Sequence, residues 1–205
     1  MRDSDDVTRP ICRISPIEYA PEDYFQPIRI RDMFPREAPL EVDLGCGDGS
    51  FLVAMGQKHP DRNYLGTERL LGRVRNTCRK ADRARLANVR MLLVESGYVV
   101  THLLPPETTS RFYLMFPDPW PKRRHWQRRL IQPDFLRAAA VALMEGGQLC
   151  IKTDDADYFG YIGNVAAECR DFARETWEED VPQTDFERHY LAQGRTIYSL
   201  CLIKR

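Results

Sequence analysis

The residues best suited to chemistry in this sequence stand in a glycine-rich loop that an acid precedes. The run Asp43-Leu-Gly-Cys-Gly-Asp-Gly49 follows a short apolar stretch and carries Gly45, Gly47 and Gly49. Glycine lets the backbone turn sharply and approach a ligand without a side-chain clash. The spacing is GxGxG and not the GxGxxG of dinucleotide binders. The loop alone is therefore also compatible with a simple tight turn between a strand and a helix.

Acids at neighbouring strand ends narrow the choice of ligand. Glu68 ends the next predicted strand, where a carboxylate is placed to accept the ribose hydroxyls of an adenosine. Asp43 is placed to receive the amino group of a methionine moiety, directly or through water. Glu95 ends the following strand, where it either accepts an adenine amino group or is solvated in a loop. A ligand that carries positive charge suits this lining, whereas a pyrophosphate does not, so the sequence predicts S-adenosylmethionine as the cofactor.

A second segment combines a rigid acid with a basic run. In Phe116-Pro-Asp-Pro-Trp-Pro-Lys122 the alternating prolines fix φ and hold Asp118 and Trp120 in place. The segment continues into basic residues that are suited to phosphates and an aromatic ring that is suited to stacking on a base. The predicted RNA-binding residues are Arg123, Arg124, Trp126, Arg128 and Arg129. Residues 69–85 add seven basic residues against one acid, and there a solvated helix face is the preferred interpretation.

The elements that position these residues alternate between strands and helices. Apolar stretches predict strands at 40–44, 63–67, 89–94, 112–116, 148–153, 175–178 and 196–203. Helical patterns cover 50–58, 70–86, 133–144 and 158–169, with a short helix or turn at 96–104. Gly146 and Gly147 are expected to end the helix before them. The pattern predicts a mostly parallel seven-stranded sheet with helices on both faces, and ligands in such sheets bind beyond the carboxyl ends of the strands.

Composition bounds the remaining possibilities. Lys and Arg total 30 and Asp and Glu total 30, so overall charge makes no case for a nucleic-acid partner. Residues 1–37 hold five prolines and are expected to form an irregular arm, followed by one domain at 38–205. The four histidines are dispersed and no CxxC pair occurs, so no metal site is expected. The longest apolar run, Ala138 to Met144, is too short to span a bilayer, and a cytoplasmic protein is expected.

The motifs together resemble the bacterial tRNA (guanine-N7-)-methyltransferases over about residues 38 to 205. The stretch FPDPWPKRRHWQRRL, from Phe116 to Leu130, is the most specific part of the resemblance, and Thr153-Asp154 and the run from Thr184 to Glu187 support it. The resemblance implies a Rossmann-like class I methyltransferase fold that uses S-adenosylmethionine. It also implies that the substrate is a guanine of tRNA, in the variable loop. Ser96 and the acidic start of the chain depart from the usual family pattern.

Roles at matching positions follow from the same resemblance. The residues implied to contact the cofactor are Asp43, Glu68, Glu95 and Asp118, with Asp118 also the acid of the catalytic site. The residues implied to contact the substrate nucleotide are Lys122, Asp154, Thr184, Asp185, Phe186 and Glu187.

The chemistry of guanine explains why no general base is expected. N7 already has a free lone pair, so catalysis rests on alignment and on electrostatics as the purine becomes cationic. Asp118 or Asp154 would stabilise that charge. Three alternatives stay open: a methyltransferase of a protein side chain or small amine, a nicotinamide-dependent oxidoreductase, and an RNA-binding protein without activity. The basic run counts against the first alternative, because it favours an RNA substrate. The glycine spacing counts against the oxidoreductase, and the acids at 43, 68 and 118 count against a protein without activity.

Overall fold

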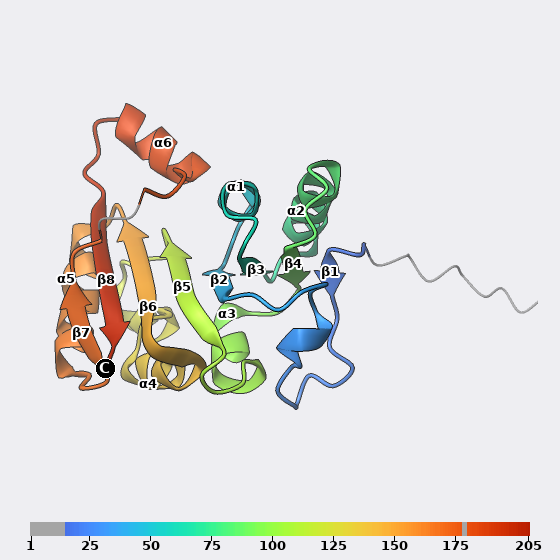
Figure 1. Ribbon diagram of the computed structural model, residues 1–205. Coiled ribbons are helices and arrows are strands. Elements are labelled where there is room, and N and C mark those ends of the chain that lie inside the picture. The colour runs from blue at the N-terminus through green and yellow to red at the C-terminus, as the bar shows by residue number, and fades with distance from the viewer. Residues whose placement is uncertain (1–14, 178–179) are drawn as a thin grey trace, which may run out of the picture.

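The chain folds around an eight-stranded, mostly parallel sheet (Figure 1). This computed structural model describes residues 15–177 and 180–205. The strands are β1 (Glu18–Tyr19), β2 (Leu40–Leu44), β3 (Asn63–Thr67), β4 (Val89–Leu92), β5 (Thr109–Met115), β6 (Leu143–Thr153), β7 (Phe172–Glu175) and β8 (Tyr198–Lys204). Their order is β1-β4-β3-β2-β5-β6-β8-β7, and only β8 runs antiparallel to its neighbours. The predicted fold class is confirmed, with β1 as an additional edge strand.

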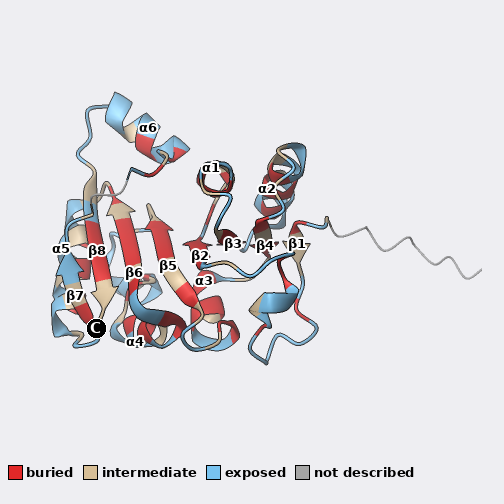
Figure 2. Cartoon of the chain, in the orientation of Figure 1, coloured by how far each residue is buried: buried red, intermediate tan, exposed pale blue. Residues whose placement is uncertain are grey.

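Helices cover both faces of this sheet. The helices α1 (Ser50–Lys58) and α2 (Leu71–Arg83) pack on one face, whereas α3 (Ser96–Tyr98), α4 (Pro133–Ala142) and α5 (Ala156–Glu168) pack on the other. A π-helical turn at Val99–Leu103 continues α3. Every residue of β2 and β3 is buried, as a sheet covered on both faces requires (Figure 2).

The helices form for reasons that are visible in their sequences. In α2 the buried residues are spaced as one helical face, at Val74, Thr77, Cys78 and Ala81, and the remaining positions are mostly basic. The first turn of α5 is capped by Asp155, whose carboxylate accepts a hydrogen bond from the Tyr158 N–H at 2.7 Å. The buried face holds α2 against the sheet, and the cap fixes the residue at which α5 begins.

The end of α4 differs from the prediction. The helix stops at Ala142 and β6 begins at once at Leu143, so the two glycines do not terminate the helix. Leu143 pairs with Thr109 and Gln148 pairs with Arg111, which leaves an excess of residues on β6. A bulge takes up that excess, and Gly146 adopts a φ of +70° within it.

The region before β2 contributes to the sheet and the core. Within the described residues 15–37, β1 pairs in parallel with β4, and the side chains of Ile17, Ile28, Met33 and Phe34 are buried. Residues 15–37 are therefore packed against the fold that follows, although most of them lie outside regular helices and strands. The start of the segment expected to be an arm, 1–14, lies outside the described residues, and the division at residue 38 stays a prediction.

A helix that was not predicted lies above the carboxyl ends of the strands (Figure 1). This helix, α6 (Asp185–Ala192), begins after Thr184, whose hydroxyl accepts a hydrogen bond from the Glu187 N–H at 2.9 Å. A threonine followed three residues later by glutamate is the pattern of a capping box, so the sequence held a signal for it. The strand predicted at 175–178 is observed earlier, as β7 (Phe172–Glu175), with Phe172 as its buried side chain. Residues 178–179 lie outside the described part of the chain.

Candidate active site

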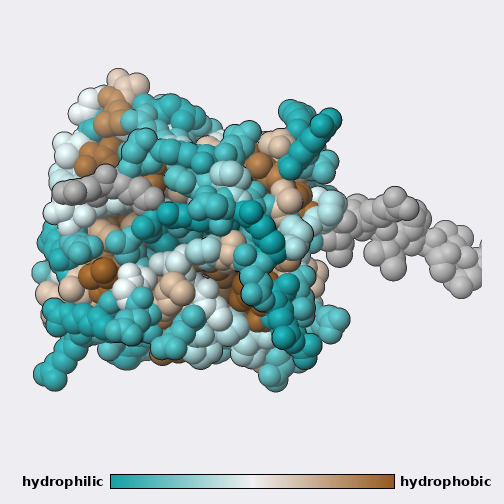
Figure 3. All heavy atoms as spheres, in the orientation of Figure 1, coloured by the Kyte–Doolittle hydropathy of each residue, from teal (hydrophilic) through white to brown (hydrophobic). Residues whose placement is uncertain are grey.

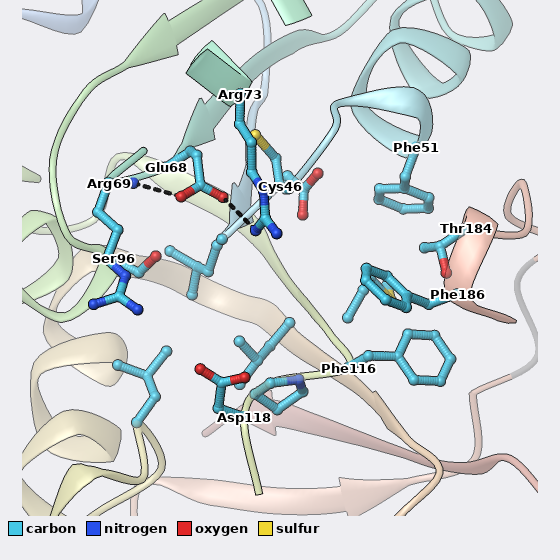
Figure 4. A pocket seen from close by; sticks show the side chains of 18 of the residues that line it. Cys46, Phe51, Glu68, Arg69, Arg73, Ser96, Phe116, Asp118, Thr184 and Phe186 are labelled. Atoms are coloured by element: carbon cyan, nitrogen blue, oxygen red, sulfur yellow. Dashed lines mark hydrogen bonds and ion pairs between the residues drawn. The ribbon is translucent and has the colours of Figure 1, made fainter. Parts of the chain in front are cut away.

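The carboxyl ends of the parallel strands open into one cleft of about 730 Å³. Its walls come from the glycine loop after β2, the end of β3 and start of α2, the end of β4, the loop after β5 and the start of α6. Figure 4 shows Glu68 and Arg73 on one side of the cleft and Asp118 on the other, with Phe51, Thr184 and Phe186 along a third side. The rule for ligand sites in open parallel sheets therefore locates this cleft correctly.

The glycine loop owes its shape to backbone conformations that glycine adopts readily. Gly45 and Gly47 have φ values of +73° and +57°, and both line the cleft. Gly49 also has a positive φ, but it is not among the residues that line the cleft. A Cβ at Gly49 would lie 2.2 Å from the side chain of Thr77 in α2. Gly49 therefore allows α1 to begin close against α2, and its predicted contact with the cofactor is not supported.

Asp43 presents a buried carboxylate without a full set of partners. Its side chain is 3% exposed, and its Oδ2 atom has no hydrogen-bond partner among the described residues. Burial, followed by the nearby charges of Asp48 and Glu68, raises the pKa of Asp43 to about 8. An ammonium group in the cleft would supply the missing partner and favour the ionised form. The acidic wall therefore fits the methionine end of S-adenosylmethionine.

The raised pKa of Asp43 predicts a pH dependence for the ligand-free protein. Between about pH 4 and pH 8 the folded chain holds a proton on Asp43 that the unfolded chain, with a pKa of 3.8, has released. Stability should therefore fall as the pH rises across that window. We expect the melting temperature of the parent to fall more steeply from pH 5 to pH 8 than that of Asp43→Asn. Parallel curves for the two proteins would show that Asp43 is already ionised in the fold.

Glu68 and Glu95 are held by backbone N–H groups. The Glu68 Oε1 atom accepts hydrogen bonds from the N–H groups of Arg69 and Leu70 at 2.8 and 2.9 Å, and its Oε2 atom lies 3.5 Å from Arg73. Glu68 is 6% exposed, and these contacts fix its carboxylate in the wall of the cleft (Figure 4). Glu95 is exposed, and its carboxylate caps α3 by accepting from two N–H groups. Both acids line the cleft as predicted.

The serine that departs from the family pattern has a structural partner. The hydroxyl of Ser96 lies 2.8 Å from that of Thr67, which also accepts a hydrogen bond from the Gly45 N–H at 3.2 Å. Ser96 is thus part of the support beneath the glycine loop.

The loop after β5 places Asp118 in the cleft. Phe116 and Trp120, which flank it, have positive φ values of +55° and +45°, which are uncommon for side chains of this size. Asp118 is exposed, lines the cleft and has no hydrogen bond or ion pair to another described residue. Its carboxylate is therefore free to interact with a ligand. Phe116 and Trp120 also line the cleft, as the sequence predicted for a Trp120 held beside Asp118, whereas Phe116 had been given no role.

The basic segment after this loop divides into exposed and buried parts. Arg123, Arg124 and Arg128 are exposed, and Arg128 lies over the ring of Trp120 at 5.0 Å and lines the cleft. Trp126 is 37% exposed. Arg129 is only 4% exposed and therefore cannot reach a phosphate in this conformation. Its predicted RNA contact is not supported, because its side chain turns inward onto aromatic rings.

The residues implied to bind the substrate nucleotide also divide. Thr184, Asp185 and Phe186 line the cleft at the start of α6, and Phe186 is 53% exposed. The remaining three lie outside the lining and are Lys122, Asp154 and Glu187.

Each of these three has its own surroundings. The Asp154 Oδ2 atom pairs with Arg195 at 2.5 Å, and the Glu187 Oε1 atom pairs with Lys152 at 2.6 Å. Glu187 is buried and ties α6 to β6, whereas Lys122 is exposed beside the basic segment. The Glu187 Oε2 atom has no hydrogen-bond partner among the described residues, so a substrate contact by Glu187 stays a prediction, while its Oε1 ion pair holds the neighbouring cleft residues in place.

Residues 15–177 and 180–205 contain no cluster of three or more His, Cys, Asp or Glu side chains suited to a metal ion. Within the same ranges no helix is long and apolar enough to cross a membrane.

Comparison with known proteins agrees with the site. A family described as "Putative methyltransferase" matches residues 37–200. A tRNA (guanine-N(7)-)-methyltransferase of Alkalilimnicola ehrlichii is 34% identical over 186 residues, which cover 88% of this chain and 78% of that protein. A tRNA (guanine-N(7)-)-methyltransferase of Halorhodospira halophila is 38% identical over 180 residues, which cover 84% of this chain and 78% of that protein.

Solved structures establish the fold independently. An S-adenosylmethionine-dependent O-methyltransferase of Thermotoga maritima superposes with a TM-score of 0.58 at 14% identity, covering 87% of this chain and 66% of that one. A Streptococcus mutans protein described as "a putative methyltransferase", solved with S-adenosylhomocysteine, superposes with a TM-score of 0.54 at 13% identity, covering 82% of this chain and 90% of that one. The fold, the glycine loop and the acidic cleft define a class I methyltransferase that uses S-adenosylmethionine. Within that class, the chain belongs to the tRNA (guanine-N(7)-)-methyltransferase family.

Proposed function

We propose that this protein transfers a methyl group from S-adenosylmethionine to N7 of a guanine in tRNA, in the variable loop. The proposal depends on what one cleft brings together. One wall is acidic and suits a cationic cofactor, and the opposite side holds Asp118, whose loop continues into an exposed basic segment. The curated relatives bear the name of this activity. A tRNA substrate would place the reaction in the cytoplasm, where the sequence predicts the protein to act.

The cofactor roles follow from the walls of the cleft. Asp43, with its unpartnered buried oxygen, would accept the amino group of the methionine moiety. Glu68 would accept the ribose hydroxyls on the lone pairs that its backbone contacts leave free. The backbones of Gly45 and Gly47 would approach the cofactor closely, and Glu95 would face the adenine. A nicotinamide dinucleotide would bring pyrophosphate against Asp43 and Glu68, which is unfavourable.

The substrate would enter from the side of Asp118 and α6. S-adenosylmethionine supplies the methyl group from its sulfonium centre. Guanine N7 attacks with its own lone pair, the new N–C bond forms as the S–C bond breaks, and sulfur keeps the bonding electrons. No proton moves at N7, and the purine becomes cationic. Asp118 would stabilise that charge, and Phe116 and Phe186 would contact the flat base.

The proposal has a direct test. The protein is incubated with isotope-labelled S-adenosylmethionine and unfractionated tRNA from cells that lack this activity, and the digested nucleosides are then identified by mass spectrometry. We expect label in 7-methylguanosine. Label in another nucleoside would redirect the substrate assignment. Transfer to protein or to small amines, with none to tRNA, would favour a methyltransferase of another substrate.

The exposed basic residues are expected to provide salt-sensitive affinity for tRNA. Changing Arg123, Arg124 and Arg128 together to Ser should weaken tRNA binding and reduce the salt dependence, by about 0.9 in logarithmic slope for each lost duplex phosphate contact. Binding of S-adenosylmethionine should change little. Filter binding at several salt concentrations and calorimetry with the cofactor measure the two effects.

A matched variant separates a local interface from a general charge effect. Arg31, Arg137 and Arg170 are exposed and do not line the cleft, so changing them to Ser removes the same charge elsewhere. This variant should keep nearly the parental affinity and slope. Equal losses in the two variants would mean that the basic segment is no more than a solvated face.

A further inference from the structure

Arg129 is a buried arginine without an acidic partner. Its side chain is 4% exposed, and within residues 15–177 and 180–205 no carboxylate forms an ion pair with it. Its guanidinium carbon lies 4.6 to 4.8 Å from the ring centres of Trp126, Tyr158 and Tyr161. Aromatic faces attract a cation, so these three rings replace part of its lost hydration. Such a costly arrangement, inside a run of exposed basic residues, suggests a specific task for this side chain.

Among the described residues, this side chain makes one hydrogen bond, and that contact points to the task. The Arg129 Nε–H group donates a hydrogen bond to the carbonyl oxygen of Pro119 at 2.8 Å. Pro119 directly follows Asp118, and the three prolines of the loop have no N–H groups with which to hold it. The uncommon φ values of Phe116 and Trp120 also require support from the surrounding structure. A donor from outside the loop therefore fixes the Pro119–Trp120 peptide, one residue beyond the proposed catalytic-site acid.

The aromatic cage itself is anchored in the core. Tyr158 is fully buried in α5, and the Tyr161 hydroxyl donates to Gln132 Oε1 at 2.7 Å. The Gln132 Nε2 group in turn donates to the carbonyl oxygen of Trp126 at 2.9 Å. The cage thus links α5 and the segment before α4 to the Asp118 loop through a single guanidinium.

We propose that Arg129 is a positioning residue, which holds the Pro119–Trp120 peptide, and with it the Asp118 loop, in its working place and does not bind tRNA phosphate. The proposal rests on the proposed function for its effect on catalysis. Its effect on loop order is independent of any substrate. Misplacing a reacting group by about 1 Å can cost about 100-fold in rate, so loosening the loop should slow methyl transfer strongly.

The test compares Arg129→Met with two other Arg→Met variants. Arg124→Met removes an exposed charge of the basic segment, and Arg137→Met removes one from the exposed side of α4. Three quantities are measured: hydrogen exchange of peptides spanning 116–128, the single-turnover methylation rate with both substrates saturating, and the salt slope of tRNA binding. Arg129→Lys keeps the charge and a donor and provides a folded variant should Arg129→Met fail to fold.

We expect Arg129→Met to speed exchange in the loop and to lower the methylation rate about 100-fold, with the salt slope unchanged. Arg129→Lys should recover part of both losses, Arg124→Met should lower the salt slope with parental loop exchange, and Arg137→Met should change none of the three quantities. A reduced slope in Arg129→Met with parental loop exchange would overturn the proposal, because Arg129 would then contact phosphate. If the parent fails to methylate tRNA, the proposed function fails, and loop exchange alone still decides whether Arg129 holds the loop.

Discussion

Asp118→Asn is expected to lower the single-turnover methylation rate about 100-fold or more while leaving the melting temperature unchanged. The substitution keeps the shape of the side chain and removes the charge that would stabilise the cationic purine. Asp118 is exposed to the cleft and makes no hydrogen bond or ion pair within the described residues. Its loss therefore has no evident route to an effect on folding.

The measurement uses saturating tRNA and S-adenosylmethionine, so that lost binding does not mask or imitate lost chemistry. Asp61→Asn, at an exposed turn far from the lining of the cleft, serves as the matched control. A parental rate in Asp118→Asn would show that the carboxylate is not an electrostatic stabiliser. The charge on the purine would then have to be met by Asp185 at the start of α6.

Glu68→Ala should produce the largest loss of cofactor affinity. A buried charged acceptor of hydroxyl hydrogen bonds is worth about 1.5–3 kcal/mol, which corresponds to about 10- to 150-fold in Kd. The variant also releases the N–H groups of Arg69 and Leu70, so Glu68→Gln, which keeps an acceptor for them, is the control for local structure.

Calorimetry with S-adenosylmethionine and with NAD distinguishes the possible results. We expect the parent to bind only S-adenosylmethionine, Glu68→Gln to bind it several-fold more weakly and Glu68→Ala to bind it least. Undiminished binding in Glu68→Ala would place the ribose elsewhere in the cleft. Tight binding of NAD by the parent would contradict the cofactor assignment itself.

The parts of the fold that follow from local pattern were predictable from the sequence. The apolar runs that became β2 and β3 were placed at their observed bounds, because each is a continuous buried strand flanked by turn residues. Their ends in turn placed the glycine loop and Glu68 at the cleft. The helix α6 was overlooked, although Thr184 and Glu187 stand at the spacing of a capping box.

Features that depend on the direction of a side chain were not predictable. Arg128 and Arg129 are adjacent and chemically identical, yet one lines the cleft and the other is enclosed by aromatic rings contributed by α5 and by Trp126. Gly47 and Gly49 belong to the same motif, but they have different roles. Gly47 lines the cleft, whereas Gly49 leaves room for the side chain of Thr77 in α2. These differences arise from contacts between segments distant in sequence, which spacing within one segment does not encode.

The claim that guanine N7 is the methyl acceptor can be tested by removing that atom. A tRNA is assembled from synthetic pieces with 7-deazaguanine, which has carbon in place of N7, at the guanine that the protein methylates in the unmodified molecule. Binding of the two tRNAs is measured in parallel, because the substitution leaves the phosphates and the Watson–Crick edge intact. We expect equal binding and no methyl transfer to the modified tRNA. Continued methylation of the 7-deaza position would contradict the assignment of N7 as the acceptor.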